Sequence, residues 1–103
     1  MNSTKQIPSF QFLQQQREKI LMLAEKHGAK NVRVFGSVAR GQADEESDID
    51  FLIDYDLDKI SPWFPAGLLL DWEGLLGFRV DVVTERGIKP RIKEWVLKEA
   101  IAL

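Results

Sequence analysis

Two aspartates stand two positions apart at the start of a segment that has the composition of a β-strand. Asp48 and Asp50 flank Ile49, and β-branched and aromatic residues continue as far as Tyr55. Side chains two positions apart on a strand lie on the same face, with their Cα atoms about 6.6 Å apart, so both carboxylates could bind a pair of divalent cations. The alternative is an exposed acidic pair that protects a sheet edge from aggregation.

A Gly-Ser pair precedes these aspartates, between a short apolar run and a segment that can begin a helix. Gly36 would let backbone amides approach an anion closely, and Ser37 would start a helix whose N-terminal N–H groups favour phosphate. Taken alone, such a turn is usually only a helix cap, and it is neither a Walker motif nor a dinucleotide fingerprint. Arg40 could reach the same phosphate, or it could pair with Asp44 or Glu45.

A third carboxylate interrupts a later apolar run. Asp81 stands among three valines, Val80, Val82 and Val83. A buried, unpaired carboxylate is strongly penalised, so we expect a cation to meet it. Arg79, two residues earlier on the same strand face, is the competing partner. If this strand lies beside the one that carries the Asp pair, three carboxylates converge next to the Gly-Ser turn.

Composition excludes several other kinds of site. The chain has 103 residues, 45% of them apolar, which suits one domain over 1–103 with a loose tail at 1–8. It has no cysteine, so thiol chemistry and sulfur-ligated zinc are excluded. Its one histidine, His27, is expected to cap a helix end. With 14 basic and 16 acidic residues, it offers no broad surface for nucleic acid. We expect a cytoplasmic protein without a membrane segment.

The spacing of apolar residues, together with glycines and prolines that end regular structure, predicts alternating helices and strands. Ser9 is the expected N-cap of a first helix that Gly28 ends. Further helices are expected at 38–42, 68–76 and 90–99, and strands at 32–35, 48–55 and 78–84. The expected fold class is α+β, a small mixed sheet backed by helices. On the second strand, Ile49, Phe51 and Ile53 would face the core, and the aspartates the opposite side.

Together these segments form one signature: Gly36-Ser37-Val38-Ala39-Arg40-Gly41, five residues, Ser47-Asp48-Ile49-Asp50, and a later Asp81. The signature resembles the DNA polymerase beta-like nucleotidyltransferase superfamily, and more closely the minimal nucleotidyltransferase (MNT) proteins. The resemblance runs from about Val32 to the C-terminus and implies the nucleotidyltransferase fold. It assigns Asp48, Asp50 and Asp81 to two Mg²⁺ ions, and Gly36 and Ser37 to a nucleoside triphosphate such as ATP.

The residues agree with that chemistry on separate grounds. Phosphoryl transfer needs charge neutralised around in-line oxygens, which metals on a carboxylate cluster provide without histidine or cysteine. Asp81 is the best candidate to help deprotonate the acceptor hydroxyl, and Arg40 is a further candidate for nucleotide binding.

The resemblance also implies a partner. MNT proteins are commonly antitoxins of HEPN-domain ribonuclease toxins, and some transfer AMP from ATP to a tyrosine of the toxin. With 103 residues, little chain remains for a domain that holds the acceptor, so we expect another chain to bring it and a hetero-oligomer to form. The alternative is a binding module that neutralises its partner by occlusion.

Overall fold

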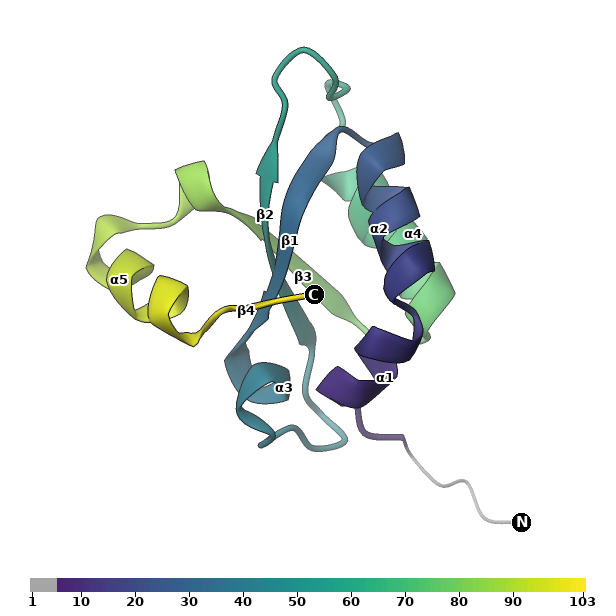
Figure 1. Ribbon diagram of the computed structural model, residues 1–103, viewed down its shortest axis with the longest axis vertical. Coiled ribbons are helices and arrows are strands. Elements are labelled where there is room, and N and C mark those ends of the chain that lie inside the picture. Colours follow the sequence, from purple (N-terminus) through teal and green to yellow (C-terminus); the bar gives the residue numbers. More distant parts are fainter. Residues whose placement is uncertain (1–5) are drawn as a thin grey trace.

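A computed structural model of the chain describes residues 6–103. Its centre is a four-stranded mixed sheet in the order β3-β2-β1-β4 (Figure 1). Strand β1 (Ala29–Phe35) is antiparallel to β2 (Ile49–Tyr55), and β3 (Val80–Thr84) runs parallel to β2. The short β4 (Ile101–Ala102) pairs antiparallel with the other side of β1. The prediction of a small mixed sheet backed by helices is confirmed.

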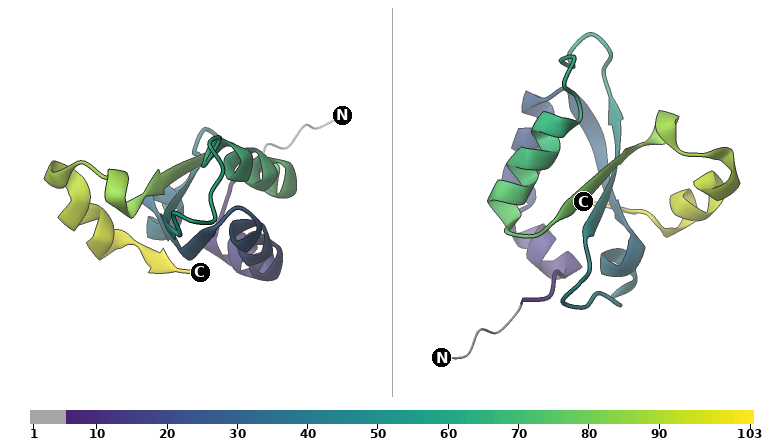
Figure 2. Two further views of the ribbon diagram at one scale, coloured as in Figure 1. Left: turned by 90° about the horizontal axis from the view of Figure 1, so that it is seen from above. Right: turned by 180° about the vertical axis from the view of Figure 1, so that it is seen from behind.

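Helices α1 (Phe10–Gln15), α2 (Arg17–Lys26) and α4 (Ala66–Leu76) cover one face of the sheet (Figure 2). The alternation along β2 explains this, because Ile49, Phe51 and Ile53 all lie in the core beneath these helices, as predicted. Trp72 of α4 is fully buried with its ring centroid 4.2 Å from that of Phe51. This packing fixes the strand whose opposite face carries the aspartates.

The opposite face of the sheet is covered only in part. The 3₁₀ turn η1 (Glu85–Gly87) and α5 (Pro90–Glu99) follow β3 and lie on this side (Figures 1 and 2). A small second cluster of Leu52, Ile88 and Val96 joins α5 to the sheet. Helix α3 (Gly36–Arg40) begins directly at the end of β1. The remainder of this face stays open at the level of Asp50.

The first predicted helix is in fact two helices. Gln16 has φ −100° and ψ 10° and separates α1 from α2. Nothing in the residue types there accounts for the break. Ser9 is the N-cap as predicted, because its Oγ accepts a hydrogen bond of 3.1 Å from the Phe12 N–H. His27 stands at the C-cap position of α2, and its Nε2 lies 2.7 Å from Oδ2 of Asp71, so a specific side-chain partner accompanies the predicted cap.

Several element boundaries differ from the prediction. Strand β1 begins three residues earlier, at Ala29, because Ala29 and Lys30 pair with Tyr55 and Asp54 across the sheet. Neither η1 nor β4 was predicted, since two or three residues give no periodicity to recognise.

The predicted loose tail at 1–8 falls mainly on residues 1–5, which lie outside the described part of the chain. Within the described part, Gln6 and Ile7 are exposed and Pro8 is buried. Across residues 6–103 no helix is long and apolar enough to cross a membrane.

Candidate active site

The turn between β1 and α3 requires a glycine for two reasons. Gly36 has φ +76°, a conformation that side chains with a Cβ rarely adopt. A Cβ placed there would also lie 2.1 Å from Oδ2 of Asp50. The turn therefore brings its backbone directly against the second aspartate of the Asp-x-Asp pair. Within residues 6–103 the Ser37 hydroxyl makes no hydrogen bond, which leaves it available to a ligand.

Asp50 and Asp81 are directly opposite each other on the parallel strands β2 and β3. Neighbouring strands are about 4.8 Å apart, so the two side chains emerge side by side on the open face. Burial and the negative charges of Asp81 and Asp48 raise the pKa of Asp50 to about 6. Glu99 adds to this effect, and Arg40 opposes it. The turn and the carboxylates thus form one electrostatically coupled group.

Asp81 occupies a different environment from the one its sequence predicts. The side chain is exposed, because β3 is an edge strand and α5 leaves this part of the face uncovered. The sequence argument that Asp81 needs a cation because it is buried is therefore wrong, since Asp81 is exposed. The predicted pairing with Arg79 is also wrong, since Asp81 makes no ion pair or hydrogen bond within the described residues.

Within residues 6–103, Asp48 is one of two partners of the Arg79 side chain, whose Nη2 also donates a hydrogen bond of 3.2 Å to the Glu46 carbonyl. Asp48 stands one position before β2, and Nε of Arg79 lies 3.0 Å from its Oδ1. That oxygen is sheltered from solvent, and its geometry with Arg79 is that of an ion pair without a hydrogen bond. The Arg79 side chain is itself 71% exposed, so it can move away at little cost. Asp48 is thus paired with Arg79, whereas Asp50 and Asp81 lie opposite each other on neighbouring strands.

The donor set suits a hard divalent cation. Carboxylate oxygens are the ligands that Mg²⁺ prefers, and the sheltered Oδ1 of Asp48 and the raised pKa of Asp50 both indicate negative charge that protein groups do not fully compensate. In the arrangement observed, residues 6–103 contain no cluster of three or more acidic, histidine or cysteine side chains close enough to hold a metal ion. In this arrangement Asp48 is paired with Arg79.

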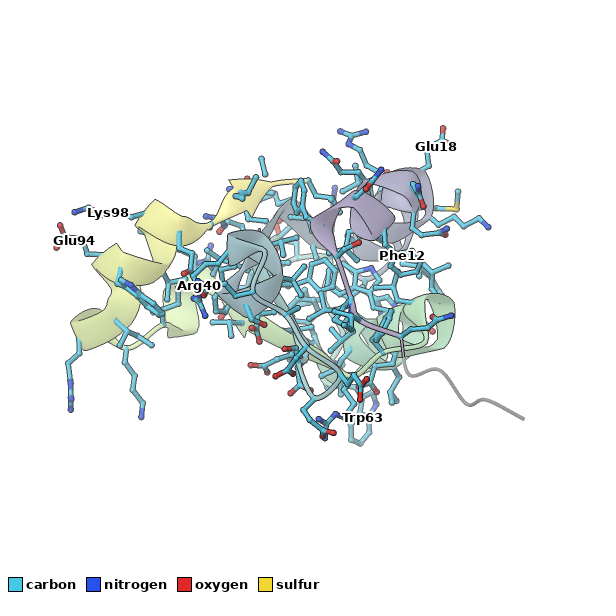
Figure 3. The ribbon with its side chains drawn as sticks, turned by 90° about the horizontal axis from the view of Figure 1, so that it is seen from below. Phe12, Glu18, Arg40, Trp63, Glu94 and Lys98 are labelled. Atoms are coloured by element: carbon cyan, nitrogen blue, oxygen red, sulfur yellow. The ribbon has the colours of Figure 1, made fainter. Side chains whose placement is uncertain are left out.

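Arg40 points toward α5 and not toward the acidic loop. Its Nη1 donates a hydrogen bond of 2.5 Å to Oε1 of Glu99, and its Nε donates one of 2.9 Å to Oε1 of Gln42. Figure 3 shows the labelled Arg40 where α3 faces α5. The predicted alternative, a pair with Asp44 or Glu45, is wrong. The partner is 59 residues away, at the end of a helix whose position the sequence does not reveal.

Sequence comparison identifies the relatives of this arrangement. Residues 16–103 match the family model for the nucleotidyltransferase domain. The chain is 39% identical over 85 residues, 82% of its length and 90% of the relative's, to a Methanocaldococcus jannaschii protein named provisionally as a protein adenylyltransferase. It is 38% identical over 80 residues, 77% of its length and 79% of the relative's, to the protein adenylyltransferase MntA of Thermococcus cleftensis.

Comparison of structures confirms the predicted fold. A solved structure described provisionally as a minimal nucleotidyltransferase superposes with a TM-score of 0.81 at 50% identity, covering 93% of this chain and 97% of that one. A toxin-antitoxin crystal structure with AMP-PNP shares the fold at 22% identity, with a TM-score of 0.69 over 82% of this chain and 69% of that one. Since the family model extends over most of the sequence and the relatives align along most of their own length, the chain belongs to the nucleotidyltransferase domain family of enzymes.

Proposed function

We propose that the protein transfers AMP from ATP to a hydroxyl group of a partner protein and thereby acts as an antitoxin. The observation that carries this proposal is the position of Asp50, which lies opposite Asp81 across β2 and β3 and directly against the backbone of Gly36. The next residue, Ser37, has a hydroxyl that makes no hydrogen bond within residues 6–103. Such a site joins an acidic group to an anion-binding turn, which is what nucleotidyl transfer needs.

Asp48, Asp50 and Asp81 would hold Mg²⁺, which neutralises negative charge on the triphosphate and on the reacting oxygens when bound. The turn that Gly36 shapes would hold the triphosphate through the Ser37 hydroxyl. The acceptor oxygen attacks the α-phosphorus, the bond from that phosphorus to the bridging oxygen of the β-phosphate breaks, and pyrophosphate leaves. Asp81 is the candidate base for the hydroxyl proton, because its exposure on the edge strand leaves it accessible to an acceptor from another molecule.

The relatives support a protein as the acceptor. Two relatives carry the name protein adenylyltransferase, and the fold is shared with a solved toxin-antitoxin assembly. A protein acceptor also suits the open face around Asp81, which no element of residues 6–103 covers. The acceptor we propose is a tyrosine of a HEPN-domain toxin, presented in a hetero-oligomer.

The experiment is transfer to a HEPN-domain toxin encoded beside this protein, followed by intact-mass spectrometry. With ATP and Mg²⁺, the toxin should gain one AMP mass or a small multiple, and substoichiometric enzyme should suffice because catalysis turns over. Asp81→Ala should abolish the mass gain and leave complex formation intact. Asp54→Asn is the matched control, since Asp54 lies on the same face of β2 but pairs with Arg33.

Occlusion gives the opposite pattern. If the protein neutralises its partner only by binding, an unmodified toxin is silenced at equimolar protein, and the Asp81→Ala variant works as well as the parent. That result would replace the enzyme assignment with a binding module.

A further inference from the structure

A single carboxylate from α5 holds the turn at the start of α3. Oε2 of Glu99 accepts a hydrogen bond of 2.7 Å from the backbone N–H of Gly36, and Oε1 accepts the 2.5 Å bond from Arg40. The Glu99 side chain is only 11% exposed. The Arg40 guanidinium also lies 6.0 Å from the ring centroid of Trp95 on the same helix. One carboxylate therefore joins both ends of α3, its first amide and its last side chain.

The position of this carboxylate is fixed by the sheet. Glu99 is the last residue of α5, and β4 begins two residues later and pairs with β1 at Val34 and Arg33. Beyond β4, Nε of Arg17 donates a 2.8 Å hydrogen bond to the Leu103 carbonyl. Because β1 leads directly into Gly36, the strand that ends at the turn also anchors the segment that delivers Glu99. The carboxylate thus reaches the turn on a short and well-held connection.

The contact has two consequences for a ligand at the turn. The Gly36 N–H is already hydrogen-bonded, so it is not a free donor for phosphate. The positive charge of Arg40 is already compensated by a nearly buried carboxylate. Within residues 6–103, the groups left for a ligand at the turn are the Ser37 hydroxyl, which makes no hydrogen bond there, and the carboxylates of Asp50 and Asp81.

We infer that Glu99 is a positioning residue for the nucleotide site, and that Arg40 acts through Glu99 and not on phosphate. This inference rests on the proposed function, because it presumes that the turn binds a nucleotide. Glu99 keeps the Gly36 backbone against Asp50 and orients α3, so that Ser37 meets the triphosphate in a turn that is already shaped. Pre-organisation of this kind raises affinity by removing the ordering cost from the binding step.

Two other roles for the same contact predict different changes in nucleotide affinity. If the carboxylate merely occupied a phosphate subsite, removing it would tighten nucleotide binding. If Arg40 bound phosphate directly, its removal would weaken binding whether or not Glu99 were present. We call the contacts of Glu99 with Gly36 and Arg40 the clamp. If the clamp positions the turn, Glu99→Ala and Arg40→Ala should each weaken nucleotide binding. The double variant should then bind the nucleotide as tightly as either single variant.

The test is titration calorimetry with a non-hydrolysable ATP analogue and Mg²⁺, at a temperature where urea denaturation shows each variant folded. We expect Glu99→Ala to weaken binding about tenfold, the effect of one charged hydrogen bond. Glu99→Gln, which keeps an acceptor for the Gly36 N–H, should fall between the parent and Glu99→Ala. Glu94→Gln is the matched control, because Glu94 is an exposed α5 residue whose only ion pair within residues 6–103 is with Lys98. Tighter binding by Glu99→Ala, or additive losses in the double variant, would overturn the inference.

A second readout separates this inference from the proposed function. Amide hydrogen exchange at Gly36 and Ser37 needs no nucleotide, and the clamp predicts slow exchange at Gly36 in the parent and much faster exchange in Glu99→Ala. If the parent binds no ATP analogue while Gly36 is protected by Glu99, the proposed function fails and the clamp is a structural contact only. If Gly36 exchanges equally fast in both proteins, the clamp itself is wrong.

Discussion

Replacing Asp50 by asparagine should stabilise the protein in the absence of metal. Burial, Asp81 and Asp48 raise the pKa of Asp50 from 3.8 to about 6, so at neutral pH its charge opposes folding. Asparagine has the same shape and no charge, and Asp50 makes no hydrogen bond within residues 6–103 that the substitution would break.

The magnitude follows from linkage. A shift of about two pH units corresponds to about 3 kcal/mol if all of it acted on folding. Asp50 is only half-buried, so solvent screens part of the repulsion, and we expect about 1 kcal/mol. For a chain of this size that amounts to a rise in Tm of about 5 °C.

The sign of the pH dependence is specific. Below pH 4 the carboxyl is protonated in both folded and unfolded chains, and the substitution removes no charge repulsion. Between pH 4 and 6 the unfolded chain loses the proton before the native one does, so the parent loses stability as pH rises. The advantage of Asp50→Asn should therefore appear across this interval and stay constant above it.

The assay is urea denaturation of parent and variant in EDTA, at intervals between pH 3.5 and 8. The control is Asp54→Asn, on the same strand face, whose carboxylate accepts hydrogen bonds from Arg33 and Asn31. That variant should be destabilised at neutral pH, because it loses an attraction and not a repulsion. An Asp50→Asn protein that is less stable than the parent at pH 7 would refute the reasoning, as would an advantage that does not change with pH.

Three further predictions concern the turn, the cation and the histidine. Mg²⁺ with ATP should raise Tm in a thermal shift assay, and Asp48→Asn combined with Asp50→Asn should abolish that rise; an unchanged rise would remove the site assignment. Gly36→Ala should cost about 1–2 kcal/mol in urea denaturation through its positive φ and also displace the Asp50 carboxylate, so ATP-dependent stabilisation should vanish as well; retained stabilisation would contradict the contact. The hydrogen bond from His27, and then that from Lys26, lowers the pKa of Asp71. The stability that the Asp71 carboxylate contributes should therefore be lost as pH falls below about 4. In urea denaturation, Asp71→Asn should flatten that part of the pH profile.

The sequence predicts strands β1, β2 and β3 because each of these has its own alternating pattern, which the two-residue β4 lacks. Ile49, Phe51 and Ile53 lie in the core and Asp50 on the open face, as a period of two requires. The placement of β3 beside β2 was a condition in the sequence argument, and the Asp50 to Asp81 register now satisfies it. Local patterns of this kind survive because burial on one face decides the register.

What the sequence could not predict are the long-range partners of charged side chains. Arg79 was the alternative partner for Asp81 because the two share a strand face, yet it contacts Asp48. Arg40 was expected to reach phosphate or to pair with Asp44 or Glu45, yet it contacts Glu99. Long cationic side chains select partners by tertiary position, and a sequence pattern contains no information about how α5 returns to β1. The only available signal for Glu99 was a glutamate at the end of the amphipathic last helix, which is too common to single out.

The charge balance around the turn connects these partners to the chemistry. Four carboxylates lie in this region, those of Asp48, Asp50, Asp81 and Glu99, and two guanidinium groups, those of Arg40 and Arg79, accompany them. Arg40 is paired with Glu99, and Arg79 is paired with Asp48. The excess negative charge therefore lies mainly on Asp50 and Asp81, which are opposite each other on β2 and β3. Burial, and then the charges of Asp81 and Asp48, raise the pKa of Asp50, so this pair of carboxylates is costly to leave without a cation. A cation would therefore be bound most strongly at β2 and β3, the two strands that the proposed function places next to the acceptor.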